Sequence, residues 1–246
     1  MQQQNILDTA EELFELNLPD RTIHGALHLP GIKRPPYVIT CHGLFSTMES
    51  DKFTAIANAF TKAGIAIIRF DFSGCGKSSG YISDTTISRR IEELEKVVAF
   101  SKNHPALGKK FGILGSSLGG YVSLFFASEN HVDALSVWAT PYDLAETCNN
   151  IPENDLKILN QSFFDDSSKY NLSSILTKID TLQIIHGKKD LTVPWQHAEK
   201  IYNGANHPKK LIFFPEGDHS ISTKYDREKA VNESLNWILN RLINTK

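Results

Sequence analysis

Short apolar segments alternate with helical patterns along most of this chain, and no other feature limits its fold as strongly. The segments are rich in β-branched and aromatic residues, and they lie at residues 37–41, 65–71, 111–115, 134–139, 182–186 and 210–214. Continuous apolar strands of this kind are typical of a sheet covered on both faces. Their alternation with helices predicts an α/β fold with a mostly parallel sheet and helices on both faces.

The two ends of the chain add further elements. Residues 13–18 and 22–29 flank Pro19-Asp20-Arg21, a turn signal, and predict an antiparallel hairpin at the start of the sheet. A last helix is expected near residues 227–243. It would bury a stripe of four apolar side chains: Val231, Leu235, Ile238 and Leu242.

A helix is also expected after residue 86, because apolar residues recur there at helical spacing. Its buried stripe would consist of Ile87, Ile91, Leu94 and Val98. Charged residues four apart would pair on its outer face. These pairs are Arg89 with Glu93 and Glu92 with Lys96.

Residues 141–178 interrupt the alternation, since they are polar and irregular around the apolar pair Phe163-Phe164. A connection this long inside a compact domain is usually functional or disordered. We therefore expect a single domain over residues 1–246 with a small lid inserted at about 141–178. A helical turn or two is expected at 155–162. A surface excursion without a function is the alternative.

Composition narrows the class of protein. The formal net charge is −2 and no basic cluster is present, which argues against a nucleic-acid or anionic-membrane binder. The three cysteines, Cys41, Cys75 and Cys148, are far apart and form no CxxC pair, so neither a disulfide framework nor a metal site is indicated. A reducing, cytoplasmic location is expected, and the start MQQQNILDTAEE has no signal-peptide pattern.

The uncharged run at residues 111–128 is long enough to raise the question of a membrane span. Eight of its eighteen residues are Gly or Ser, however. We interpret it as a buried strand, a turn and a helix, and expect no stable membrane insertion.

A GxSxG pattern occurs twice, centred on Ser78 and on Ser117. A nucleophile elbow needs a strand that runs directly into a tight turn, with a helix starting after the serine. Ser117 meets this demand, because an apolar strand precedes it and an apolar helix can follow. Ser78 lies several residues beyond a strand and precedes a loop. Its Gly76-Lys77-Ser78 also imitates a P-loop, but Asp71 stands where the first glycine is required.

A serine nucleophile needs a base and an orienting acid. His219 follows the segment at 210–214 in a loop before the last helix, and Asp190 follows the segment at 182–186. Both would lie at the carboxyl edge of the sheet. Asp218 is the alternative acid. His42 and His186 each end a strand before a glycine, a position that more often serves turn geometry and packing.

An oxyanion hole should supply two backbone amides. We expect one from Leu118, directly after the nucleophile at a helix N-terminus. The second is expected from Leu44 in the loop after residues 37–41, with Phe45 as the alternative. Four aromatic residues could line an apolar substrate pocket, although packing in the core is at least as common a role. They are Phe45, Phe163, Phe164 and Trp195.

These motifs together resemble the α/β-hydrolase fold family over nearly the whole chain. The order Ser117, Asp190, His219 matches the order typical of that family. His42-Gly43, the run from Asp71 to Ser78 and the run from His186 to Pro194 agree with it. The sequence looks most like the compact esterase branch of feruloyl, cinnamoyl and monoacylglycerol-lipase-like enzymes. The resemblance implies an eight-stranded sheet and a small lid after the sixth strand.

The resemblance implies a serine carboxylesterase that acts through an acyl-enzyme on a small-molecule ester, with no cofactor or metal. The same triad serves all acyl transfers, so a thioesterase or a serine peptidase is the rival within catalysis. A hydrolase-fold binding protein that does not turn over is a third possibility. Substrate identity, oligomeric state and physiological role are not indicated by the sequence.

Overall fold

An eight-stranded sheet forms the centre of the computed structural model, which describes residues 10–243. Most of the N-terminal stretch that was interpreted above as lacking a signal peptide lies outside the described residues. The strands are β1 (Ala10–Asn17), β2 (Thr22–Leu29), β3 (Tyr37–Cys41), β4 (Ala66–Phe70), β5 (Phe111–Ser116), β6 (Ala134–Trp138), β7 (Leu182–Gly187) and β8 (Lys209–Phe214).

The spatial order of the strands is β1-β2-β4-β3-β5-β6-β7-β8. Strand β2 runs antiparallel to both of its neighbours, β1 and β4. All pairings from β4 through β8 are parallel. The predicted sheet is therefore confirmed, and the strand limits agree to within one residue except that β1 begins earlier, at Ala10. Every residue of β3 to β7 is buried, as continuous apolar strands require.

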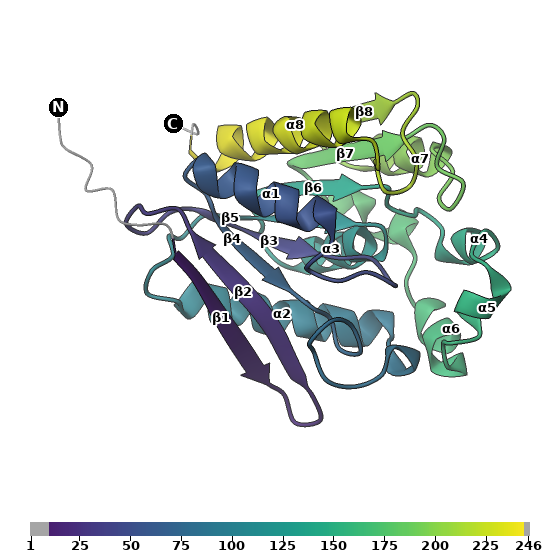
Figure 1. Cartoon of the computed structure of the whole chain (residues 1–246). Coiled ribbons are helices and arrows are strands. Elements are labelled where there is room, and N and C mark those ends of the chain that lie inside the picture. Colours follow the sequence, from purple (N-terminus) through teal and green to yellow (C-terminus); the bar gives the residue numbers. More distant parts are fainter. Residues whose placement is uncertain (1–9, 244–246) are drawn as a thin grey trace.

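Helices cover both faces of the sheet, as predicted (Figure 1). The first face packs against α1 (Asp51–Lys62) and α8 (Lys224–Leu242). The second face packs against α2 (Ile87–Asn103), α3 (Leu118–Glu129) and α7 (Gln196–Gly204). Two apolar cores result, one on each side of the sheet, and the parallel strands between them end at a common edge.

The predicted outer face of α2 is wrong at Glu93, which is fully buried. Its Oε1 accepts a hydrogen bond from Arg21 Nε at 2.7 Å and one from Ser73 Oγ at 2.5 Å. Local spacing pairs Glu93 with Arg89, whose Nε lies 3.6 Å away. The partners that make burial of this carboxylate tolerable come from distant parts of the chain, so helical periodicity could not indicate them.

The lid segment, residues 141–178, contains short helices that project beside the carboxyl edge of the sheet (Figure 1). They are α4 (Leu144–Cys148), α5 (Glu153–Leu156) and α6 (Gln161–Ser167), followed by the 3-10 turns η2 (Leu172–Ser174) and η3 (Leu176–Lys178). A further turn, η1, lies at Ile82–Asp84. The helix expected at 155–162 is thus divided, since α5 ends at Leu156 and α6 starts at Gln161.

Hydrogen bonds fasten the lid segment to the helices beneath it. Asp166 accepts bonds from the Ser88 amide at 2.8 Å and the Ser88 hydroxyl at 2.7 Å, at the start of α2. Tyr121 of α3 donates to the Tyr170 carbonyl at 2.7 Å. The segment is therefore a packed part of the fold. Within residues 10–243, no helix has both the length and the apolar character needed to cross a membrane.

Candidate active site

Ser117 lies in a sharp turn between β5 and α3, at the carboxyl edge of the sheet. Its φ of 54° and ψ of −125° fall outside the regions that L-residues favour. The Ser117 amide donates to the Trp138 carbonyl at 2.8 Å, which holds the turn against β6. Backbone strain of this kind persists only where the surroundings enforce it and is common at functional sites.

The two glycines of this motif are required by close approach of the backbone. A Cβ on Gly115 would lie 2.6 Å from the Gly119 carbonyl oxygen, and a Cβ on Gly119 would lie 2.1 Å from the Cys41 carbonyl oxygen. Both distances are far below contact distance. The spacing of the glycines around Ser117 therefore follows from the crossing of β5, α3 and the end of β3.

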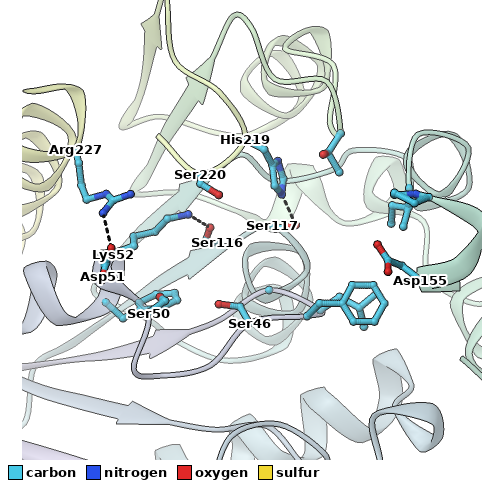
Figure 2. A pocket seen from close by; sticks show the side chains of 17 residues that line it. Ser46, Ser50, Asp51, Lys52, Ser116, Ser117, Asp155, His219, Ser220 and Arg227 are labelled. Atoms are coloured by element: carbon cyan, nitrogen blue, oxygen red, sulfur yellow. Dashed lines mark hydrogen bonds and ion pairs between the residues drawn. The ribbon is translucent and has the colours of Figure 1, made fainter. Parts of the chain in front are cut away.

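The structure brings Ser117, His219 and Asp190 into one hydrogen-bonded chain. Figure 2 shows the hydrogen bond between His219 and Ser117. His219 Nε2 lies 3.1 Å from Ser117 Oγ, and His219 Nδ1 lies 2.8 Å from Asp190 Oδ2. A carboxylate oxygen only accepts, so the proton of the neutral imidazole belongs on Nδ1. Nε2 is then an acceptor that faces the serine hydroxyl, which is the arrangement a general base requires.

Asp190 is held as an anion. Burial by itself would raise its pKa, but hydrogen bonds from His186 and His219 hold the pKa well below its usual value. Asp190 Oδ1 also accepts from the Thr192 amide at 2.9 Å and the Val193 amide at 2.8 Å. The carboxylate is therefore fixed in place and remains charged opposite His219.

His186 is a contact of Asp190 that our sequence reasoning missed. It is fully buried at the end of β7, and its Nε2 lies 2.8 Å from the Val193 carbonyl and 3.2 Å from Asp190 Oδ2. Two acceptors around one nitrogen indicate that Nε2 carries the proton. The four-residue spacing from His186 to Asp190 is the signal for this contact in the sequence, which otherwise favours a role of His186 in turn geometry and packing.

The side chains of the alternative serine and the alternative acid bond to other groups. Ser78 is buried, its Oγ accepts from the His24 amide at 2.9 Å and it donates to the Asp71 carbonyl at 2.6 Å. Asp218 Oδ1 accepts from the Ser220 and Ser222 amides at 3.1 and 2.9 Å, within its own loop. Each side chain stabilises the backbone of a loop.

The loop after β3 approaches the nucleophile closely. A Cβ on Gly43 would lie 3.3 Å from Ser117 Cβ, and Leu44 follows it. The fully buried Arg90 of α2 donates to the carbonyls of Gly43 at 3.3 Å and Leu44 at 3.2 Å. Neither the Leu44 amide nor the Leu118 amide donates to a protein acceptor within residues 10–243.

A cavity of about 460 Å³ opens beside Ser117 and His219 (Figure 2). Its lining includes the loop at residues 43–46, the start of α1, and Ile151, Pro152 and Asp155 of the lid segment. Two cations, Lys52 and Arg227, also line it. Neither residue could be identified from the sequence, because neither belongs to a motif.

Of the four aromatic residues expected in a substrate pocket, Phe45 alone lines this cavity. Phe163 is buried in the core and packs edge-on against Phe164. Phe164 lines a different cavity, between α3 and the lid segment. Trp195 precedes α7 and packs on Phe213. The prediction that Phe163, Phe164 and Trp195 line this cavity is therefore wrong. Apolar character alone does not distinguish a core residue from a residue of the cavity wall.

Comparisons with known proteins agree with this fold. The model of a family described as alpha/beta hydrolase fold matches residues 36–161. The uncharacterized protein YfhR of Escherichia coli O157:H7 is 28% identical over 211 residues, which are 83% of this chain and 70% of YfhR. The mouse mitochondrial palmitoyl-protein thioesterase ABHD10 is 27% identical over 218 residues, 78% of this chain and 72% of its own.

Among solved structures, Est1E from Butyrivibrio proteoclasticus with bound ferulic acid superimposes with a TM-score of 0.82 at 19% identity. The match covers 93% of this chain and 98% of Est1E. At this identity the likeness concerns the fold alone. The family model covers just over half of the chain. The chain therefore belongs to the α/β-hydrolase fold family.

Proposed function

We propose that this protein is a serine hydrolase that cleaves carboxylic esters through an acyl-enzyme intermediate. The observation that supports the proposal is the continuous chain from Ser117 Oγ through His219 to Asp190, with distances of 3.1 and 2.8 Å. A serine at a strained elbow, a neutral imidazole facing it and a buried carboxylate behind are the parts that acyl transfer requires.

The reaction follows from this order of groups. Ser117 Oγ attacks the ester carbonyl carbon while His219 Nε2 takes the hydroxyl proton. The resulting imidazolium is stabilised by Asp190. Collapse of the tetrahedral intermediate breaks the bond to the alcohol oxygen, which receives the proton from His219. Water then attacks the acyl-enzyme, again giving a proton to His219, and the carboxylic acid leaves as Ser117 regains its hydrogen.

The oxyanion would be bound by the Leu44 and Leu118 amides. Leu118 is the first residue of α3, where the helix dipole favours negative charge. Arg90 binds the carbonyls of Gly43 and Leu44 and so restricts the orientation of the Leu44 peptide. Loss of one such donor typically costs about 3 kcal/mol of transition-state stabilisation.

The proposal is tested with a fluorophosphonate probe and a short p-nitrophenyl ester. We expect the probe to label Ser117, as located by peptide mass spectrometry, and Ser117→Ala to abolish both labelling and hydrolysis. Ser78→Ala is the matched control, because it removes the hydroxyl of the other GxSxG motif. Labelling that survives Ser117→Ala and disappears in Ser78→Ala would overturn the assignment.

A thioesterase is the second candidate, and the likeness to ABHD10 favours it. Mouse ABHD10 is named a palmitoyl-protein thioesterase and is 27% identical to this chain. The same three side chains would attack a thioester carbonyl in the same way. Rates for an ester and a thioester with the same acyl group, measured side by side, distinguish the two activities. Faster thioester cleavage after correction for intrinsic reactivity supports the thioesterase.

The cytoplasm is the proposed location. Cys41, Cys75 and Cys148 are all free thiols, which suits a reducing compartment. The ABHD10 relatives are named as mitochondrial, so mitochondria are the alternative. Cell fractionation with an antibody to the protein separates the two.

A further inference from the structure

A lysine lies beside the nucleophile in the candidate active site. Lys52 is the second residue of α1, and its Nζ donates to Ser116 Oγ at 2.7 Å. Ser116 directly precedes Ser117, and consecutive Cα atoms are about 3.8 Å apart. Lys52 lines the cavity, and Figure 2 shows it reaching toward Ser116 beside the Ser117–His219 pair. A cation thus lines the same cavity as the nucleophile and bonds to the residue that directly precedes it.

The charge of Lys52 has no direct counter-ion. Within residues 10–243 no carboxylate oxygen lies within 4.0 Å of Nζ. Its contacts are the Ser116 hydroxyl and the Trp138 ring, whose centroid is 5.7 Å away, and the carboxylates of Asp190 and Asp218 act on it only from a longer distance. Burial lowers the pKa of Lys52 to about 8, and Arg227 adds to this effect. At neutral pH most of the population still carries the charge, so an anion in the cavity would stabilise it.

Positive side chains lie on one side of the cavity and a carboxylate lies on the other. Arg227 lines the same side as Lys52, where its Nη1 lies 3.6 Å from Asp51 Oδ2. Asp155 of the lid segment lines the opposite side, and Ser117 lies between (Figure 2). Asp51 is 92% exposed, so its pairing with Arg227 is largely screened by water. An anionic substrate group would be attracted toward Lys52 and repelled from Asp155.

We propose that Lys52, together with Arg227, forms a subsite for a carboxylate, so that the preferred substrates are esters bearing an anionic group close to the scissile bond. This inference rests on the proposed function, because it names the substrate class of the same site. The neutral part of such a substrate would lie toward Ile151 and Pro152 of the lid segment. Lys52 would bind the substrate directly and take no part in proton transfer.

A purely structural role for Lys52 predicts a different result. If Lys52 only supported the elbow through Ser116, its loss would slow all esters equally. If it binds an anion, its loss would slow charged esters more than neutral ones of the same shape. The ratio of kcat/KM for a charged and a neutral ester therefore separates the two roles.

The experiment uses two matched pairs of esters. Para-acetoxybenzoate against para-acetoxybenzamide varies the charge on the alcohol side. The second pair varies the charge on the acyl side. It compares the mono-p-nitrophenyl ester of adipic acid, which has a free carboxylate, with the p-nitrophenyl ester of adipic acid monoamide, which has a carboxamide in its place. We expect the wild type to prefer the carboxylate in at least one pair. Lys52→Gln should lower that preference by about tenfold, the effect of losing one charge-assisted hydrogen bond.

Two further variants control the measurement. Lys62→Gln removes an exposed charge at the other end of α1, about 15 Å along the helix axis, and should leave the preference unchanged. Lys52→Arg keeps the charge and should retain a preference for the carboxylate. A wild type without preference in either pair, or a preference that persists in Lys52→Gln, overturns the inference.

Failure of the proposed function gives a separate result. If the wild type cleaves the neutral esters and Ser117→Ala does not, the proposed function stands whatever the charge preference. If no ester is cleaved, calorimetric binding of para-hydroxybenzoate against para-hydroxybenzamide still tests the subsite. Tighter binding of the carboxylate by the wild type, lost in Lys52→Gln, supports the subsite, and equal binding rejects it.

Discussion

The two GxSxG segments of this chain have the same pattern and different structures. At residues 115–119 the glycines are needed because backbone from β3 and α3 leaves no room for a Cβ. At residues 76–80 both glycines have positive φ, 51° for Gly76 and 96° for Gly80. In the first segment the requirement is close packing. In the second segment it is a left-handed conformation that favours glycine, alone at Gly80 and joined at Gly76 by the Asp71 carboxylate, 2.0 Å from the position of a Cβ.

The two serine hydroxyls differ in the same way. Ser78 is buried and bonded to two backbone groups, so its hydroxyl joins the loop to His24 near the start of β2. Ser117 is partly exposed and lines the cavity, and its hydroxyl bonds to His219. A hydroxyl becomes a nucleophile when its partner is a base facing a cavity, and it becomes a structural tie when its partners are fixed backbone groups.

The largest expected effect concerns the acid behind His219. Asp190→Asn should lower kcat by about four orders of magnitude, because an amide in place of the carboxylate favours the wrong imidazole tautomer and leaves the imidazolium unpaired. Asp218→Asn should change kcat by less than about tenfold, since an Asn oxygen can still accept the Ser220 and Ser222 amides. Steady-state kinetics on a p-nitrophenyl ester provides the test. If Asp218→Asn lowered kcat more than Asp190→Asn does, Asp218 and not Asp190 would be the acid that orients His219.

The next largest effect is a loss of stability on replacing the last glycine of each segment, Gly119 or Gly80, by alanine. Gly119→Ala would place a Cβ 2.1 Å from the Cys41 carbonyl oxygen, so it should destabilise the fold by about 3 kcal/mol or more. Gly80→Ala has no contact shorter than 3.7 Å but keeps a positive φ, at a cost of about 1–2 kcal/mol. Urea denaturation measures both. Equal losses would contradict the distinction between packing and conformation.

A pH effect of similar size is expected from His42, whose ring joins the loop after β3 to Phe72, which follows β4. Its Nε2 accepts the Phe72 amide at 2.9 Å, and its Nδ1 lies 2.7 Å from the Gly43 carbonyl. Burial, with Arg90 nearby, lowers the pKa of His42 to about 3. Below the unfolded value of about 6.5, the unfolded chain binds a proton that the folded protein does not bind. Stability therefore falls as the pH decreases from about 6.5 toward 3.

The contribution of His42 amounts to about 2 kcal/mol between pH 7 and pH 5. His42→Gln keeps a hydrogen-bond acceptor but does not titrate, so its unfolding free energy should lose this part of the pH dependence. Denaturant titrations of both proteins at the two pH values measure the difference. An unchanged pH dependence in His42→Gln would show that another group titrates in this range.

The smallest expected effect is on the structural serine. Ser78→Ala should lower the free energy of unfolding by about 1 kcal/mol, because the partly buried His24 amide loses its acceptor. Ser79→Ala is the matched control, since Ser79 is exposed and water can replace its bond to the Thr22 amide. Thermal denaturation compares the two. A loss in Ser79→Ala as large as that in Ser78→Ala would remove the structural role assigned to the buried hydroxyl.

Local pattern predicted most of the fold. Strands β3 to β8 were found as runs of apolar residues and the β1–β2 hairpin from its turn signal, and each predicted limit lies close to the observed one. The order of Ser117, Asp190 and His219 could be placed at one edge because parallel strands end on the same side of a sheet. The role of Glu93 could not be predicted, since its partners Arg21 and Ser73 are 72 and 20 residues away.

The sequence by itself determined the alternating strands and helices, the elbow at Ser117 and the set of polar loops that follow the strands. These features depend on neighbouring residues, through hydrophobic periodicity and the space available at a turn. Tertiary structure alone decided that Lys52 lies beside Ser117 without a carboxylate partner within residues 10–243, that His186 contacts Asp190, and that Phe163 packs in the core. Burial and electrostatic pairing depend on distances through space, which local sequence does not encode.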